Sequence, residues 1–280
     1  MRAFFGHATV HVMAFAVAAT GLVAAQPTPR GNQPRTAPPA VTKRPAVPAA
    51  PRADASVPFR VGETLTWDVS WSQYMVAGSA TSRVVEKRAS ANSSAYYILA
   101  EGKPLPIIAR IYALYYKMDS LMDSVSTLSQ RTSFYMEEGS RKHSVSTTFN
   151  RTARRAVFET YSDPPGKNDF AVPPDVQDGL ATLYALRARS FKPGDHITVP
   201  VVDEGVIYSV TFDVGAVETV KVPLGSTSAW SIGVTILDAS KQPVGRDIRA
   251  WISTDARRLP VKIQAELPVG NFILALRTAP

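Results

Sequence analysis

The segment Leu65-Thr66-Trp67-Asp68-Val69-Ser70-Trp71 carries the clearest structural pattern in this sequence. Its large apolar residues alternate with small or polar ones, so one face of the segment is apolar and the other is polar. A period of two residues is typical of a β-strand that buries one of its faces. The segment therefore predicts a half-buried strand in a sheet.

A second predicted strand follows closely. The stretch 76–86 carries Gly78, Ala80 and Ser82 at alternate positions. Small side chains at these positions leave room for the bulky rings of the first strand, which would lie across its neighbour. We therefore expect the two segments to be adjacent in the sheet.

Similar runs continue along the chain, separated by turns rich in glycine, proline and aspartate. They cover residues 96–100, 112–118, 129–137, 143–149, 156–161, 196–202, 206–214, 218–222, 229–237, 246–253, 260–266 and 271–276. About a dozen short strands at this spacing predict a mainly β protein built from antiparallel hairpins. We expect one strongly curved sheet or barrel, with a sandwich as the alternative.

One segment departs from the strand pattern and predicts a single packed α-helix near 175–190. Leu180, Leu183 and Tyr184 have helical spacing, and Lys192-Pro193-Gly194 ends the segment. Asp175 is predicted as the N-cap with Asp178 at N3, since carboxylates are favourable at a helix N-terminus. The apolar stripe should pack on the concave face of the sheet or close one end of it.

The region ahead of the domain divides into two predicted parts. Arg2, an apolar stretch and the sequence Val23-Ala24-Ala25 predict a signal peptide over residues 1–25, cleaved after Ala25. The alternative is an uncleaved anchor, because no charged residue lies between Arg2 and Arg30. Residues 26–58 contain nine prolines, which predicts a disordered basic linker. A single β-rich domain is then expected over 59–280, exported to the periplasm or associated with the outer envelope.

The charge distribution limits the classes of partner. The net charge is +8, but residues 1–58 hold six basic residues against one acidic residue, so five of the eight positive charges lie there. The linker could therefore contact an anionic membrane or polymer surface. The domain itself is close to charge balance and is predicted to be exported, so nucleic acid is not an expected partner.

Three segments resemble a known family. They are FRVGETL at 59–65, DGLATLYALR at 178–187, and AWISTD at 250–255 followed by RRLPV at 257–261. Together they are similar to the bacterial envelope family catalogued as domain of unknown function 3108, over about residues 59–277. The resemblance implies an exported, mostly β protein. It supplies no catalytic residues.

The sequence contains no recognisable catalytic or metal-binding pattern. There is no cysteine, and the spacing of His143 and His196 matches no metal site. Ser231 lies in a strand-like run and lacks the first glycine of a nucleophile elbow. We therefore expect no cofactor and no metal. Enzymatic activity is not favoured but stays open, because two carboxylates from distant strands could meet in a cleft without leaving a trace in the sequence.

Aromatic residues on the predicted strands suggest a ligand site. The candidate ligand-binding residues are Trp67, Trp71, Tyr112, Tyr115, Arg187 and Trp251. Arg187 is the predicted polar contact for a ligand, and Asp255 is its predicted partner. The alternative is that the aromatic rings simply fill the core of the sheet.

Three functions are compatible with these patterns. The first is a non-catalytic exported protein that binds a lipid-like or amphipathic molecule in a barrel-type cavity. The second is a structural or assembly protein that acts on other envelope proteins. The third is a hydrolase of envelope polymers, which requires a pair of carboxylates in a groove.

Overall fold

The computed structural model describes residues 53–71, 75–90, 93–110, 113–267 and 270–280. The predicted signal peptide and almost all of the predicted linker therefore lie outside the described residues, as does Tyr112. The boundaries proposed for these two N-terminal segments stay predictions.

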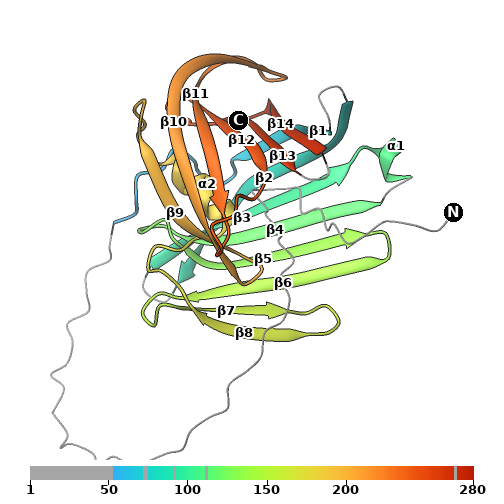
Figure 1. Ribbon diagram of the computed structural model, residues 1–280. Helices are drawn as coiled ribbons and strands as arrows, with labels where there is room; N and C mark the ends of the chain where they lie inside the picture. The colour runs from blue at the N-terminus through green and yellow to red at the C-terminus, as the bar shows by residue number, and fades with distance from the viewer. Residues whose placement is uncertain (1–52, 72–74, 91–92, 111–112, 268–269) are drawn as a thin grey trace, which may run out of the picture.

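The described residues form fourteen strands and two helices (Figure 1). In chain order the elements are β1 (Thr64–Trp71), β2 (Met75–Ser90), β3 (Ser93–Pro104), α1 (Pro106–Ala109), β4 (Leu114–Asp123), β5 (Ser129–Glu138), β6 (Arg141–Asn150), β7 (Arg155–Thr160), β8 (Gly166–Ala171), α2 (Gly179–Arg187), β9 (His196–Asp203), β10 (Val206–Val222), β11 (Gly225–Leu237), β12 (Arg246–Ser253), β13 (Pro260–Leu267) and β14 (Gly270–Thr278). The mainly β fold predicted from the alternating patterns is confirmed.

All fourteen strands belong to one antiparallel sheet. Its order is β8-β7-β6-β5-β4-β3-β2-β1-β14-β13-β12-β11-β10-β9, so consecutive strands are neighbours except β8 and β9, and the first strand, β1, pairs with the last, β14. β8 and β9 form the two edges, and the sheet does not close between them. The prediction of one strongly curved antiparallel sheet is therefore confirmed, and the sheet is open rather than closed into a barrel.

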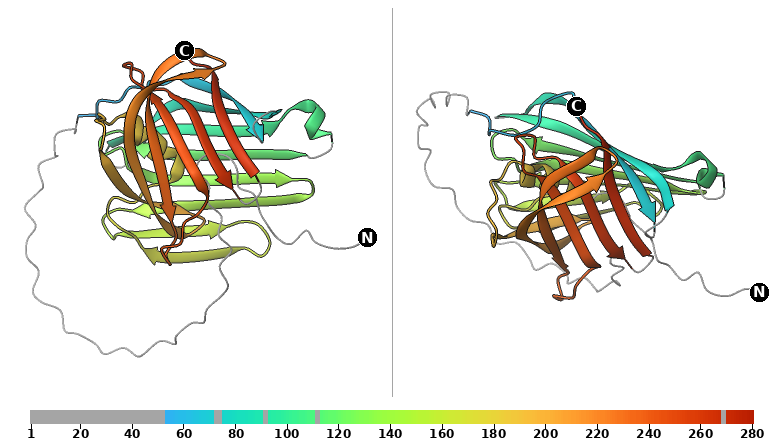
Figure 2. Two further views of the ribbon diagram at one scale, coloured as in Figure 1. Left: turned by 45° about the horizontal axis from the view of Figure 1, so that its top comes forward. Right: turned by 90° about the horizontal axis from the view of Figure 1, so that it is seen from above.

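The sheet consists of two arms that face each other. We call β1–β8 the N-terminal arm and β9–β14 the C-terminal arm; they join where β1 pairs with β14 (Figure 2). α2 lies between them, because Leu180, Ala181 and Tyr184 pack with the N-terminal arm and Leu186 packs with the C-terminal arm. The helix therefore occupies the concave side of the sheet, as its apolar sequence predicted.

The alternating residues of β1 lie opposite small residues of β2. Leu65, Trp67 and Val69 are buried, and Trp67 lies opposite Ala80 on β2. Gly78 lies opposite Val69, where an added Cβ atom would be 2.6 Å from the carbonyl oxygen of Lys103. Ala80 thus lies across from the Trp67 ring, as the spacing predicted, whereas Gly78 is required by the close approach of the β3 backbone.

The N-terminus of α2 differs from the prediction. Asp178, not Asp175, is the N-cap, and its carboxylate accepts a hydrogen bond from the backbone N–H of Ala181 at 2.8 Å. The helix cannot begin earlier because Gln177 forms a parallel bridge to Val201 of β9. Residues just before the helix are thus used to tie it to the edge of the C-terminal arm.

The four-residue helix α1 was not predicted. It follows Leu105, and β4 begins at Leu114 rather than at residue 112. A helix of four residues is too short to show a periodicity that a sequence pattern can reveal. Within the described ranges, neither helix has the length and hydrophobicity to span a membrane.

Candidate functional site

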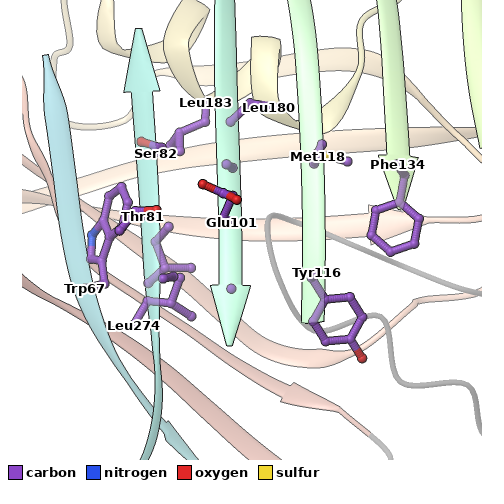
Figure 3. A pocket seen from close by; sticks show the side chains of 14 residues that line it. Trp67, Thr81, Ser82, Glu101, Tyr116, Met118, Phe134, Leu180, Leu183 and Leu274 are labelled. Carbon is purple, nitrogen blue, oxygen red and sulfur yellow. The ribbon is translucent and has the colours of Figure 1, made fainter. Parts of the chain in front are cut away.

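An apolar cleft lies between the N-terminal arm and α2. It is bordered by β1, β14 and β13, where the two arms join. Its walls are almost entirely apolar atoms. The side chains and backbone that line it come from Trp67, Ala80, Thr81, Ser82, Ala100, Glu101, Gly102, Tyr116, Met118, Phe134, Leu180, Leu183, Ile263 and Leu274. Figure 3 shows Leu180 and Leu183 reaching from α2 toward the strands, with Trp67 and Leu274 on one side and Tyr116 and Phe134 on the other.

The cleft is narrow and open to solvent. It offers about 40 Å³ to the centres of water-sized molecules, and about 530 Å³ of empty space when its open mouth is counted. One water molecule needs about 10 to 15 Å³ on the first of these measures. The deep part therefore accommodates the end of an apolar chain rather than a whole acyl chain, since side chains fill most of the space between the arms.

The apolar face of the cleft continues toward one end of the molecule. Trp67, Val69 and Trp71 lie on the same face of β1, and Leu274 and Phe272 lie on the same face of β14. Trp71 and Phe272 are paired in register and their rings are stacked, with centroids 6.5 Å apart. We call this end of the sheet the open end. A row of apolar side chains, which we call the apolar track, thus runs on this face from Trp67 in the cleft to Trp71 at the surface.

Two tyrosine side chains, Tyr116 in the cleft and Tyr184 on α2, are neutral near neutral pH. Burial raises the pKa of Tyr116 to about 12 and that of Tyr184 to about 12, so both phenols keep their protons. Tyr184 shares a hydrogen bond of 2.9 Å with Ser82. Glu101, the charged residue in the described lining, accepts a hydrogen bond from Tyr115. The arrangement can hold an apolar group but presents no obvious charged catalyst to it.

The structure places the five candidate residues that it describes in different environments, while Tyr112 lies outside the described residues. Trp67 lines the cleft, and its indole N–H donates to the carbonyl oxygen of Pro260 at 3.0 Å. Trp71 is 51% exposed at the open end. Tyr115 points away from the cleft, because Tyr116 follows it in the strand and faces inward. Sequence reasoning missed Tyr116 because the register of β4 was not known.

Trp251 is buried outside the cleft. It lies between Ala250 and Ile252, whose side chains belong to the core of the C-terminal arm, and so it faces the other side of β12. The ammonium group of Lys262 lies 4.5 Å from the centre of its ring, and its indole N–H donates to Glu218. Glu218 belongs to the far half of the β10–β11 hairpin, which packs against β13 and β14.

Arg187 is not a free polar contact for a ligand. Its side chain is completely buried and forms two parallel hydrogen bonds with the carboxylate of Glu63, at 2.6 and 2.9 Å. The predicted partner Asp255 is wrong: its carboxylate accepts hydrogen bonds from Arg257 and Ser253 instead. Pairing across 124 residues depends on the fold, which is why the sequence did not reveal it.

The buried ion pair joins the three segments that carry the family resemblance. Glu63 comes from the first segment, Arg187 from the second, and the guanidinium group also donates to the carbonyl oxygens of Arg257 and Arg258 in the third, at 3.1 and 2.9 Å. The ring of Phe59 lies 5.4 Å from that guanidinium group. These positions therefore fasten α2 to both arms, and we call this region the latch.

A second hollow, beside Asp178, has a partly polar lining that includes Asp203 and Glu204. Burial raises the pKa of Asp178, whose carboxylate also accepts a hydrogen bond from Ser120 at 2.6 Å. The hollow offers about 20 Å³, enough for one or two waters but not for a sugar ring. Asp178 is thus occupied as a helix cap in a space too small for a polymer.

The other residues considered for chemistry lie apart. Ser231 is on β11, and His196 pairs with Asp213 on the surface. His143 lies 3.1 Å from a carboxylate oxygen of Glu204. Across the described residues, no three histidine or acidic side chains gather in a way that could hold a metal ion.

Several solved structures are similar to this chain. A β-barrel-like protein of the DUF1849 domain from Brucella abortus is similar at 9% identity and a TM-score of 0.49, covering 78% of this chain and 97% of that one. A predicted exported protein with a YmcC-like fold from Bacteroides fragilis is similar at 11% identity and a TM-score of 0.36, covering 81% of this chain and 100% of that one. A predicted lipoprotein from Parabacteroides distasonis is similar at 9% identity and a TM-score of 0.37, with the same coverages.

No curated protein matches this chain. Residues 66–277 match the family described as "Protein of unknown function (DUF3108)". The matched range extends from β1 to β14 and therefore includes the whole sheet and α2.

Proposed function

This chain belongs to the DUF3108 family, and we propose that it is a non-catalytic exported protein that binds the apolar end of an amphipathic envelope molecule. The proposal rests on one observation: the cleft beside α2 is lined by apolar atoms and continues as an apolar track to the surface. The end of a hydrocarbon chain fits such a site, while the polar part of the same molecule would lie outside it.

Two further features support this proposal. The first 25 residues have the pattern of a signal peptide, which favours an envelope location. The buried ionisable groups near the cleft are engaged in structural contacts: Glu63 with Arg187, and Asp178 with the start of α2. A binding role needs no further ionisable group, whereas hydrolysis would need carboxylates that face a groove of sufficient size.

Binding can be tested with sodium dodecanoate, whose chain should enter the cleft. The methyl NMR signal of Met118, which lines the cleft, should shift on titration of the full chain with dodecanoate below its micelle concentration. Organic extraction of protein purified without detergent, followed by mass spectrometry, should identify the natural occupant. An empty extract together with unchanged methyl signals would rule the proposal out.

A matched pair of substitutions locates the site. Ala100→Leu adds three carbon atoms inside the cleft and should weaken dodecanoate binding about ten-fold or more, because the added side chain fills the space that the ligand needs. Ala171→Leu makes the same change on the exposed edge strand β8 and should leave binding unchanged. Equal affinities in the two variants would place any binding outside the cleft.

A second candidate is a structural or assembly role in the envelope. The exposed apolar side chains at the open end favour it, because such groups commonly contact a partner. This role predicts a stable protein partner and no dependence of binding on Ala100. Affinity purification after cross-linking in the native envelope would separate the two roles if it were repeated with Ala100→Leu.

A further inference from the structure

The open end carries a compact group of exposed apolar side chains. We call it the apolar tip and define it as Trp71, Met75, Val76 and Ile107, which are 51%, 52%, 37% and 70% exposed. Trp71 and Met75 are opposite each other on β1 and β2, and the N–H of Leu105, which precedes α1, bonds to the carbonyl oxygen of Ala77 on β2. The two hairpin strands and α1 therefore meet at one end of the molecule (Figures 1 and 2).

The apolar tip has positively charged neighbours. Lys103 and Arg110 flank α1, both are exposed, and residues 103–110 include no acidic residue. Neither side chain takes part in an ion pair among the described residues, in contrast to Lys142 and Arg141 farther along the same end, which pair with Glu137 and Glu138. The charge next to the tip therefore complements an anionic surface.

The positions of the tip side chains favour a lipid layer over a rigid protein surface as the partner. Met75 lies on the same face of the hairpin as Trp71, whereas Val76 lies opposite Ser70 and so faces the other side. Ile107 lies on α1, and its side chain is mostly exposed. A rigid protein surface would cover one face of the hairpin, but the headgroup region of a lipid layer can surround both faces of a tip that enters it.

We propose that the apolar tip docks this domain on an anionic lipid membrane. Trp71, Met75, Val76 and Ile107 enter the boundary between headgroups and acyl chains, and Lys103 and Arg110 contact the lipid phosphates. The exposed Trp71 ring suits this boundary, where aromatic side chains are enriched. Docking in this orientation places the mouth of the apolar track at the membrane, but docking itself does not depend on a ligand in the cleft.

Vesicle co-sedimentation of the full chain tests this proposal. Wild-type protein should bind vesicles of three parts phosphatidylcholine to one part phosphatidylglycerol more tightly than vesicles of phosphatidylcholine alone. Ile107→Asp should weaken binding to the anionic vesicles about ten-fold or more, because it places a carboxylate in the tip. Val217→Asp, at a 43% exposed apolar residue on β10, is the matched control and should bind like the wild type.

A second pair of variants distinguishes the contribution of Lys103 and Arg110 to vesicle binding from that of the predicted linker. Replacement of both Lys103 and Arg110 by alanine should reduce the preference for anionic vesicles several-fold and should also weaken its dependence on salt. The same replacement of Lys192 and Arg154, both exposed elsewhere, should not. The linker is identical in every variant, so its own attraction to anionic lipid cancels in the comparison.

Fluorescence quenching measures how deeply the apolar tip enters the lipid layer. Vesicles with brominated acyl chains should quench tryptophan fluorescence in the wild type, and Trp71→Phe should remove most of the quenching while vesicle binding persists. Three results would overturn the proposal: binding equal in Ile107→Asp and Val217→Asp, quenching unchanged in Trp71→Phe, or a dimer in solution that Ile107→Asp converts to a monomer. Ala100→Leu should still bind vesicles, so failure of ligand binding and failure of docking are distinguishable.

Discussion

The latch and the open end each contain an arginine, which is buried and paired at the latch but exposed at the open end. At the latch, Arg187 is fully buried and every polar atom of its guanidinium fork that the structure describes has a partner in Glu63 or in a backbone carbonyl. At the open end, Arg110 and Ile107 are exposed. Burial with complete pairing is typical of a site that maintains the fold, whereas exposed apolar and basic groups are typical of a surface that contacts something else.

The largest effect should come from the latch itself. Arg187→Ala leaves the carboxylate of Glu63 buried without its partner, which should lower the free energy of unfolding by about 3 to 5 kcal/mol. The exposed pair between Arg257 and Asp255 is the control, and Arg257→Ala should cost about 1 kcal/mol or less. Urea denaturation followed by circular dichroism measures both.

A second substitution shows whether the buried charge is the cause. Adding Glu63→Leu to Arg187→Ala removes the unpaired carboxylate, so the double variant should be more stable than Arg187→Ala alone. If the double variant were less stable, the carboxylate would have another partner and the latch would not depend on this ion pair.

The cap of α2 should give the next largest effect. Asp178→Ala removes the acceptor for the backbone N–H of Ala181 and should lower the free energy of unfolding by about 1 to 2 kcal/mol. Asp175→Ala removes an exposed carboxylate three residues earlier and should change it by less than about 0.5 kcal/mol. Equal effects would indicate that the helix begins earlier than observed.

The same residue should produce a pH dependence of stability. Burial raises the pKa of Asp178 in the folded state, so its protonated form is favoured by folding and its contribution to stability is lost as the pH rises through the folded-state pKa. Asp178→Asn keeps a capping side chain but does not titrate. Its stability relative to the wild type should therefore be more favourable at pH 7 than at pH 3, as measured by thermal unfolding at both values. The reverse order would show that the carboxylate is stabilised in its charged form.

The smallest effect on stability is expected at the open end. Ile107→Ser should change the free energy of unfolding by less than about 0.5 kcal/mol, because the side chain it replaces is already 70% exposed. The same change should nevertheless weaken vesicle binding. A large loss of stability would mean that Ile107 belongs to the core and would make the contrast between the two ends invalid.

Local patterns in the sequence account for most of the architecture. The alternation from Leu65 to Trp71 and the small residues on β2 predicted both strands correctly, because each depends on neighbours within one hairpin. The runs at 206–214 and 218–222 prove to be one strand, β10, with a shift in register between Val214 and Val217. An irregularity of this kind interrupts the period of two, so it resembles a turn in the sequence.

Features that depend on distant contacts could not be predicted in the same way. Whether Tyr115 or Tyr116 faces the cleft depends on the register of β4, which the adjacent tyrosines leave ambiguous. The partner of Arg187 lies 124 residues away. Trp251 has the size and position of a ligand-binding residue in the sequence, but the far half of the β10–β11 hairpin covers it.

The pairing of β1 with β14 has a consequence for how the chain acquires its structure. These strands are about two hundred residues apart, so their hydrogen bonds form only after nearly all of the described domain has left the ribosome or the export machinery. The hairpins from β2 to β8 are local and can form early, but the latch is complete only when Arg257 and Arg258, which follow β12, are available to Arg187. An exported chain with this topology would stay incompletely assembled during translocation, with apolar strand faces exposed, and would benefit from a holding chaperone until synthesis is complete.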